Sequence, residues 1–319
     1  MDNVRVNLEK GATVKVLDHG YVKLVDWMGS DEEVIEAARM STGKGFCSWH
    51  PYYRCKLCGE VDTAFDFRDA HPQSQIVGQC SHPNAKPSSD GLYPDVGRHD
   101  WERSAKGDAG LLAFLHENWH ATPFEMCELK IDVQAPIMVF REWHRHRTQS
   151  YNEMSARYVQ MPNLHYVPSV ERIIASSKAH RNKQQGGGGE LKMPPNYTEP
   201  AWTEAQIAQW VRERIAHEQA TIYGLYEALL AMGIAPEVAR VDTPVARYSR
   251  MRAKTDLRNW LAFLTLRSDN AAQWEIRQFA YAVGYIIAQL FPRTWDLWLN
   301  ASRKVPQIDK DGFLRQEAA

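Results

Sequence analysis

The densest chemical signal lies in residues 141–158, which contain four arginines, two histidines and two glutamates. So many ionisable side chains cannot all be buried without partners. The neighbouring side chains add hydrogen-bonding groups: Thr148, Gln149, Ser150, Asn152 and Ser155. Arginine makes bidentate contacts with phosphate or with a carbonyl edge of a pyrimidine. The segment therefore predicts a site for a small polyanion, and a solvated charged face is the alternative.

Two further segments add to this signal. Residues 240–258 carry a second basic cluster: Arg240, Arg247, Arg250, Arg252, Lys254 and Arg258. Arg267 follows, at an expected break between helices. Because the whole chain balances 38 Lys and Arg against 39 Asp and Glu, these clusters indicate local anion sites. Binding of nucleic acid through bulk charge is excluded.

The elements that must position these residues follow from hydrophobic periodicity. Strands are expected at 13–17, 21–25 and 126–133. Helices are expected at 30–38, 108–120, 135–146, 203–233 and 256–290, the last broken near Ser268. Ser30 and Thr203 are expected to begin their helices through capping boxes. The pattern predicts an α+β fold, with a central antiparallel sheet flanked by long helices that also suggest packing between subunits.

Residues 46–107 differ in character and are predicted to form an inserted module, which leaves 1–45 and 108–319 as the catalytic domain. The module is rich in Pro, Gly and His and holds four of the five cysteines, in the pattern C-x7-C-x2-C-x21-C: Cys47, Cys55, Cys58 and Cys80. One structural zinc held by Cys55, Cys58, Cys80 and either Cys47 or His82 is expected. A metal-free loop with reduced thiols is the alternative, and a redox couple is disfavoured because no thioredoxin-like pattern surrounds the cysteines.

Two broader expectations complete the organisation of the chain. A flexible loop is expected at 176–202, which contains Gly186–Gly189 and Pro194-Pro195. No apolar stretch is long enough to span a membrane, and the N-terminal residues do not resemble a signal peptide, so a cytoplasmic protein is predicted.

At its arginine-rich segments the chain resembles the flavin-dependent thymidylate synthases. The family signature, Arg-His-Arg followed after seven residues by Ser, is met by Arg145-His146-Arg147 and Ser155. Further matches occur in order along the chain: His120 to Glu125, Pro236 to Arg240, Leu266-Arg267 and Gln273 to Glu275. The resemblance covers residues 12–45 and 108–300, and the module at 46–107 has no counterpart.

The resemblance implies an FAD enzyme that methylates dUMP at C5 to give dTMP. Methylenetetrahydrofolate would supply the carbon unit, and NADPH the reducing equivalents. It also implies a homotetramer with active sites shared between subunits. Neither a membrane nor a nucleic acid is expected as a partner.

Roles for individual residues are carried over from the resemblance by position. Residues expected to bind FAD are Thr122, Arg145, His146, Arg147, Glu153, Asp256 and Arg258, with His120 beside the flavin. Residues expected to bind the nucleotide are Glu142, Arg145, Glu153, Ser155, Ala156, Arg157, Arg267 and, from a neighbouring subunit, Arg240. Arg267, Arg145 and Ser155 are the candidates for the catalytic centre.

The residues themselves agree with this chemistry. A uracil C5 can become nucleophilic without a cysteine adduct if fixed guanidinium groups stabilise negative charge on the ring carbonyls, a role suited to Arg267 and Arg145. Ser155 lies two residues after Glu153 and two before Arg157, a spacing suited to cradling a phosphate. No adjacent general base supports a nucleophilic serine.

The chain departs from the family pattern at four positions: Glu142 and Asp256 replace amides, Ala156 replaces Gly, and Ala271 replaces His. An ionised carboxylate only accepts hydrogen bonds, so the site could favour the amino group of cytosine. The other interpretation, which is preferred, is sequence drift at positions that still work. The alternative within the family is C5 hydroxymethylation of dCMP or dUMP. An alternative of another class is a non-catalytic scaffold for the Cys-rich module, which would have no need of FAD.

Overall fold

The computed structural model describes residues 8–55, 61–62, 101–178, 189–197 and 201–301. The chain divides into two compact units, one formed by residues 1–28 with 128–319 and the other by residues 29–127. Each unit contains its own antiparallel sheet. The predicted module at 46–107 falls within the second unit, and its boundaries remain a prediction. Cys58, Cys80 and His82 lie outside the described residues.

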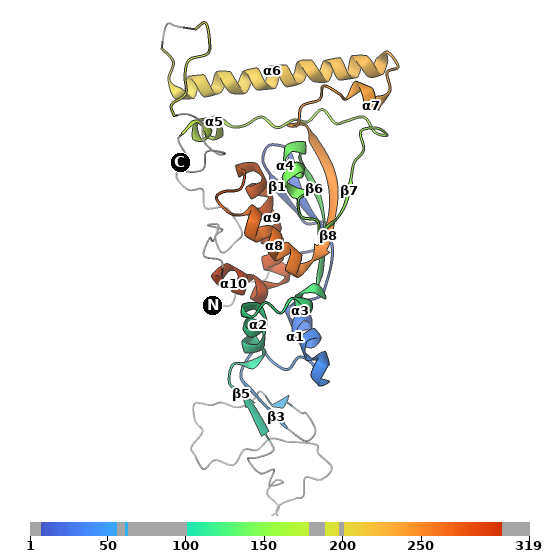
Figure 1. Cartoon of the computed structure of the whole chain (residues 1–319), viewed down its shortest axis with the longest axis vertical. Coiled ribbons are helices and arrows are strands. Elements are labelled where there is room, and N and C mark those ends of the chain that lie inside the picture. Colours follow the sequence, from blue (N-terminus) through green and yellow to red (C-terminus); the bar gives the residue numbers. More distant parts are fainter. Residues whose placement is uncertain (1–7, 56–60, 63–100, 179–188, 198–200, 302–319) are drawn as a thin grey trace, which may run out of the picture. The chain divides into compact units, whose positions relative to one another are not determined.

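The larger unit is built on a sheet with the strand order β1-β2-β6-β8-β7 (Figure 1). Its strands are β1 Thr13–Val16, β2 Gly20–Met28, β6 Glu128–Pro136, β7 Ser150–Glu153 and β8 Tyr248–Asp256. Alternate residues of β6 face the core, where Leu129, Ile131 and Val133 are fully buried. Burial of each such side chain stabilises the fold by roughly 1.5–3 kcal/mol. The predicted α+β class and the 13–25 hairpin are confirmed.

Helices α8 Leu257–Arg267, α9 Trp274–Leu290 and α10 Pro292–Ala301 follow β8 along the chain. Helix α9 packs on β1 and β2. At the hairpin, a Cβ on Gly20 would lie 2.6 Å from the Val16 carbonyl oxygen and 2.8 Å from the Phe279 ring. Glycine therefore permits the close approach of α9 to this turn. The break expected near Ser268 falls between α8 and α9, as the sequence predicted.

Three more helices belong to the same unit: α5 Val170–Ser177, α6 Glu204–Ala231 and α7 Pro236–Ala239 (Figure 1). Thr203 begins α6 through the predicted capping box, in which its hydroxyl accepts from Gln206 N and the Gln206 side chain accepts from Thr203 N. Helix α5 packs against α6. The expected loop at 176–202 is described only in part.

Strand β8 corrects the interpretation of residues 240–258. Met251, Ala253 and Thr255 point inward, so Arg250, Arg252 and Lys254 form the outward face of a strand. Arg252 pairs with Asp132 at 2.7 Å and Lys254 pairs with Glu128 at 2.6 Å. Arg252 and Lys254 are therefore engaged on the sheet surface, whereas Arg240 and Arg258 of the same cluster lie outside β8.

The helix expected at 135–146 is also shorter than predicted. Strand β6 continues through Pro136, and helix α4 spans Ile137–Trp143. Ile137 N donates to Arg247 O and Met138 N donates to Val245 O, both at 2.9 Å. These two contacts join the start of α4 to the chain that leads into β8.

The 29–127 unit contains α1 Asp31–Arg39, a short 3-10 turn at Met40–Thr42, α2 Gly107–Glu117 and α3 Ala121–Glu125. Ser30 caps α1 by accepting from Glu33 N at 3.4 Å. A three-stranded sheet with the order β4-β3-β5 joins β3 Tyr52–Cys55, β4 Val61–Asp62 and β5 Trp101–Ser104. The segment where the sequence showed little regular periodicity therefore contains strands.

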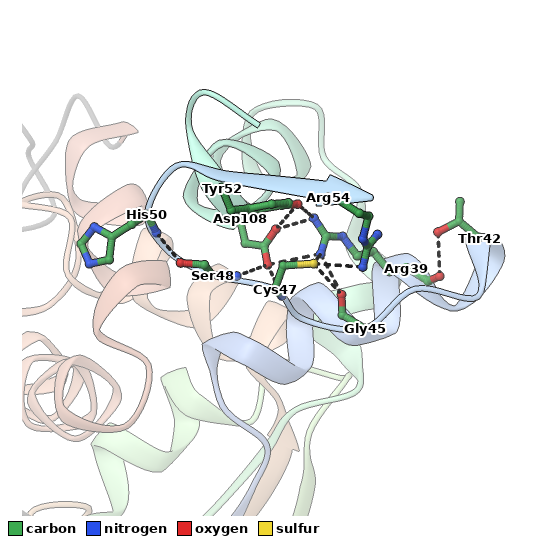
Figure 2. Close-up of polar contacts among 9 residues, drawn as sticks. All are labelled: Arg39, Thr42, Gly45, Cys47, Ser48, His50, Tyr52, Arg54 and Asp108. Atoms are coloured by element: carbon green, nitrogen blue, oxygen red, sulfur yellow. Dashed lines mark hydrogen bonds and ion pairs between the residues drawn. The ribbon is translucent and has the colours of Figure 1, made fainter. Parts of the chain in front are cut away.

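A buried carboxylate organises this unit around the first cysteine of the module (Figure 2). Asp108 is fully buried and forms an ion pair with Arg39. Its Oδ2 also accepts from Cys47 N at 2.7 Å and Ser48 N at 3.2 Å, while the Tyr52 hydroxyl donates to Oδ1 at 3.3 Å. Asp108 thus joins α1, the 47–52 segment and α2.

Candidate active site

A buried tryptophan at the end of α4 supports the turn that carries Arg145, His146 and Arg147. Trp143 is fully buried, lies 4.6 Å from the ring of Phe263 between centroids, and donates from Nε1 to Gln149 Oε1 at 3.0 Å. The Tyr151 hydroxyl is 3.1 Å from the Trp143 carbonyl oxygen and 2.8 Å from that of His146. These contacts hold both ends of the turn that carries Arg145, which explains why the residues between them can be polar and exposed.

Arg267 lies at the centre of the polar contacts around this turn. Its Nη1 donates to Glu142 Oε2 at 2.9 Å, and its Nη2 donates to the Glu142 carbonyl oxygen at 2.8 Å. Its Nε donates to His146 Nε2 at 2.9 Å. The other carboxylate oxygen of Glu142 pairs with Arg145 at 3.1 Å. The structure therefore brings together four of the predicted site residues.

The protonation state of His146 follows from these contacts. Burial, together with the positive charge of Arg267, lowers the pKa of His146 to about 4. Because guanidinium nitrogens only donate, Nε2 must accept, and the ring proton is assigned to Nδ1. At neutral pH His146 is therefore an uncharged acceptor for Arg267.

The two carboxylates that replace amides are already engaged by this chain's own donors. Oε2 of Glu142 accepts from Arg267, and Oε1 forms an ion pair with Arg145. Asp256 caps α8, where its oxygens accept from Asn259 N at 2.8 Å and Asn259 Nδ2 at 2.6 Å. The expectation that these carboxylates would favour a cytosine amino group thus loses its physical basis.

A cavity of about 300 Å³ opens beside α4. Its lining residues are Ile137, Phe140, Arg141, His144, Glu153, Met154, Ser155 and Arg240. Two guanidinium groups and one carboxylate leave the lining with an excess of positive charge, which suits an anionic group such as phosphate. Glu153, Ser155 and Arg240 were predicted to bind the nucleotide, and the fold places all three on this one cavity.

Ala156 has a structural role next to the cavity. It is 5% exposed and packs in a small core cluster with Met161, Tyr223, Tyr226 and Ala239. Since Ala156 follows Ser155 and Ala239 precedes Arg240, this cluster holds the two cavity residues in place. Arg240 thus lines a cavity of its own chain, and its contribution to the site of a neighbouring subunit remains a prediction.

Other predicted residues lie outside these contacts. Arg147 and Arg258 are exposed, and Arg258 Nη1 donates to Asn259 Oδ1 at 3.1 Å. Arg157 pairs with Glu237 at 2.9 Å on the surface. His120 and Thr122 belong to the 29–127 unit, where Thr122 is exposed on α3 and His120 meets Phe114 edge to face.

The sequence analysis gave no individual site role to five residues of the cavity wall, although three of them belong to the 141–158 segment: Ile137, Phe140, Arg141, His144 and Met154. Four of them share the spacing i, i+3, i+4 and i+7, which places them on one face of α4. Helical spacing could therefore have indicated Arg141 and His144 as lining residues, because the predicted helix included both.

Of the expected zinc ligands, the structure describes the side chain of Cys47 alone. Among the residues that it describes, no group of three or more His, Cys, Asp or Glu side chains could hold a metal ion. The Cys47 sulfur instead accepts from Arg39 Nη1 at 2.9 Å and from Arg54 Nη2 at 3.0 Å (Figure 2). The side chain of Cys55 lies outside the description, as do Cys58 and Cys80, so the zinc site remains a prediction.

The fold and the site together define an α+β protein with a cationic site for an anionic ligand. The profile of the thymidylate synthase complementing protein family matches residues 23–293. The flavin-dependent thymidylate synthase of Ehrlichia ruminantium is 31% identical over 281 residues, covering 88% of this chain and 71% of the relative. That of Thermus thermophilus is 32% identical over 288 residues, covering 90% and 78%. The chain belongs to this family, the flavin-dependent thymidylate synthases, as the Arg-His-Arg signature predicted.

A solved structure agrees with this assignment. The UMP/dUMP methylase PolB from Streptomyces cacaoi, crystallised with 5-Br dUMP, superposes with a TM-score of 0.60 and is 25% identical in sequence. The match covers 92% of this chain and 100% of PolB. No helix in the described part of the chain has the length and apolar character needed to cross a membrane.

Proposed function

We propose that this protein uses FAD to methylate dUMP at C5, with methylenetetrahydrofolate as the carbon donor and NADPH as the reductant. The observation that carries the proposal is the arrangement around α4. This helix presents Arg141 to a cationic cavity that also contains Ser155 and Arg240, and it presents Glu142 to Arg267. The cavity suits a nucleotide phosphate, and Arg267 suits a pyrimidine ring.

The chemistry requires negative charge on the ring carbonyls to be stabilised as C5 becomes nucleophilic. Arg267 can do this because its guanidinium is fixed at three points and its side chain is only 13% exposed. Fixed donors in a site of low water content stabilise developing charge without reorganisation. Arg145, which pairs with Glu142, adds a second positive charge to the same group of residues.

In this proposal Ser155 binds the phosphate of the nucleotide. Its hydroxyl accepts from Arg157 N at 3.3 Å, a short-range contact that shapes the loop. In that contact the hydroxyl is the acceptor, so its own O–H can still donate to a phosphate oxygen. This donor, together with Arg240, supports a binding role for Ser155.

The residues proposed to hold FAD are Arg145, His146, Arg147, Glu153, Asp256 and Arg258, with His120 and Thr122. Arg147 and Arg258 are exposed guanidinium groups of one unit, and such groups suit a pyrophosphate. Asp256 contributes through the α8 N-terminus, because both of its oxygens are engaged by Asn259. When bound, the flavin supplies the hydride that reduces the transferred carbon to a methyl group.

A homotetramer is proposed for the same protein. Large apolar side chains are exposed along α6 and the α7 region: Leu225, Met232, Val238 and Val241. Exposed apolar groups of this size, close together along the chain, are typical of subunit interfaces. Light scattering coupled to size exclusion tests the assembly, and a monomer at micromolar concentration would contradict it.

One structural zinc is proposed for the module at 46–107, bound by Cys55, Cys58 and Cys80. His82 is the better fourth ligand, because two guanidinium groups within 3.0 Å of the Cys47 sulfur would repel a dication. Metal analysis of purified protein decides this proposal, since less than one zinc per chain would contradict it. A matched His82→Ala and Cys47→Ala pair identifies the fourth ligand.

The function itself is tested by product mass. Purified protein is incubated with methylenetetrahydrofolate, NADPH and one of dUMP, UMP or dCMP. We expect dTMP from dUMP, and flavin absorbance in the purified protein. UMP is included because PolB, which shares the fold, is a UMP/dUMP methylase. A hydroxymethyl product, or no turnover of dUMP, would overturn the proposal.

A further inference from the structure

The contacts of Arg267 leave a defined part of its guanidinium group free. Arginine carries five N–H groups in a planar fork. Three are engaged, by His146 Nε2, by the Glu142 carboxylate and by the Glu142 carbonyl oxygen. Within the part of the chain that the structure describes, two N–H groups remain without an acceptor, one on Nη1 and one on Nη2. These are the groups with which Arg267 can meet a ligand.

Both partners of Arg267 are themselves held in place. Glu142 lies on α4 next to the buried Trp143, and its second carboxylate oxygen pairs with Arg145 at 3.1 Å. The His146 ring meets Phe263 edge to face at 4.9 Å between centroids. The guanidinium plane is therefore fixed by groups that have little freedom to follow a ligand.

We propose that Glu142, together with His146, is a positioning residue that aims the two remaining Arg267 N–H groups at the carbonyl oxygen of position four in uracil. This proposal rests on the proposed function and identifies the residues that let the enzyme distinguish dUMP from dCMP. Uracil presents an oxygen acceptor at that position, whereas cytosine presents an amino group that donates. Donor would face donor in the cytosine complex, and the fixed guanidinium could not turn away. Glu142 thus selects against cytosine by fixing Arg267.

The neutral state of His146 also favours uracil over cytosine. Its Nε2 accepts only the Nε–H of Arg267, which leaves the N–H groups of Nη1 and Nη2 to Glu142 and the substrate. The Glu142 carboxylate lies between two arginines, because Oε2 accepts from Arg267 and Oε1 forms an ion pair with Arg145 at 3.1 Å. A cytosine amino group would therefore have to compete with two guanidinium groups for these oxygens.

The test compares the affinities of the FAD-loaded full chain for dUMP and dCMP, measured by isothermal titration calorimetry. We expect the unmodified protein to prefer dUMP by roughly 100-fold or more, because unpaired buried donors discriminate strongly. Glu142→Ala should weaken dUMP binding by about tenfold and reduce the dUMP to dCMP ratio by a similar factor. Glu142→Gln should restore part of both, because its amide oxygen can still accept from Arg267. Glu213→Gln, on the exposed face of α6, is the control and should change neither.

Several outcomes would overturn the proposal. One is an unmodified protein that binds dCMP as tightly as dUMP, and another is a Glu142→Ala variant with an unchanged ratio. If Glu142→Ala does not fold, as judged by its unfolding midpoint against Glu213→Gln, Arg267→Lys replaces it. A lysine cannot present two N–H groups in the same plane, so an unchanged ratio in that variant is equally decisive. Failure of the proposed function is distinct: it appears as a lack of dTMP formation by the unmodified protein.

Discussion

Arg39 and Asp108, 69 residues apart in the chain, form a two-point ion pair in which the carboxylate is shielded from solvent. The pair joins the end of α1 to the start of α2. Backbone N–H groups of Cys47 and Ser48 complete the coordination of the carboxylate. The segment that carries the first cysteine is thereby attached to a charge that has no solvent contact.

Removing this charge should destabilise the 29–127 unit strongly. Asp108→Ala leaves the Arg39 guanidinium and two buried N–H groups without their acceptor, which costs about 3–5 kcal/mol. Asp132→Ala, which breaks the exposed pair with Arg252, is the matched control and should cost about 0–1 kcal/mol. Urea denaturation of the full chain measures both. Equal losses would show that the buried pair contributes no more than a surface pair.

Stability should fall with acid in a window set by His146. The folded-state pKa is about 4 against an ordinary value of 6.5, so the unfolded chain binds more protons between these values. The free energy of unfolding should therefore decrease as the pH falls from about 6.5 to about 4, and this contribution is absent above 6.5. His146→Gln should flatten this part of the profile, whereas His217→Gln on the exposed face of α6 should leave it unchanged. Urea titrations across this pH range provide the measurement, and parallel profiles for the two variants would refute the assignment.

The cavity next to α4 should recognise the phosphate of the nucleotide. Arg240→Ala should weaken dUMP binding by about tenfold to a hundredfold, the usual effect of losing a charged hydrogen bond. Deoxyuridine lacks the phosphate, so its affinity should not change. Arg252→Ala, on the outward face of β8, is the control for the loss of positive charge. Calorimetric titration with both ligands checks this prediction, and an equal loss for deoxyuridine would assign Arg240 to the base or the sugar.

Two glycines with left-handed backbone angles allow packing to be separated from backbone strain. A Cβ on Gly29, at φ 97°, would lie 2.5 Å from Cys127 Sγ, whereas a Cβ on Gly43, at φ 65°, would meet nothing within 4 Å. Gly43→Ala should cost about 1–2 kcal/mol from strain alone. Gly29→Ala should cost roughly 1–3 kcal/mol more, because the buried sulfur must move. Thermal unfolding of both variants checks the difference, and equal midpoints would mean that the Cys127 side chain relocates freely.

The Cys127 thiol, which lies next to Gly29, is expected to be unreactive in the folded protein. The thiol is fully buried, and burial raises its pKa to about 12. The thiolate is the reactive form, so Cys127 should resist alkylation until the 29–127 unit unfolds.

The sequence predicted those features that depend on periodicity and on specific local chemistry. The hairpin around Gly20, the Thr203 cap and the break after Arg267 each follow from neighbouring residues. Strand β8 was not predicted, because its outward positions carry Arg250, Arg252 and Lys254 and obscure the alternation with Met251 and Ala253. Those charges are offset by Asp132 and Glu128 of the adjacent strand, which no local pattern indicates.

The residue types in the sequence were sufficient to select the candidate site residues, but they did not show which of these residues contact one another. Glu142, His146 and Arg267 were each selected from the sequence, yet their mutual contacts span up to 125 residues. Because a carboxylate only accepts hydrogen bonds, Glu142 could have favoured the amino group of cytosine. The structure argues against that preference by showing that Glu142 is paired with Arg267 and Arg145.

Strand β7 is the last strand of its sheet, and it is only four residues long. It lies between the Arg-His-Arg turn and Ser155, and Met154 N extends its pairing by donating to Arg250 O at 2.8 Å. Short edge strands open at low free energy compared with the centre of a sheet. A nucleotide held by the proposed residues on both sides of β7 would favour the paired form of this strand. Ligand affinity would then depend on how readily the sheet edge opens, and a substitution that loosens β7 would weaken binding without touching the ligand.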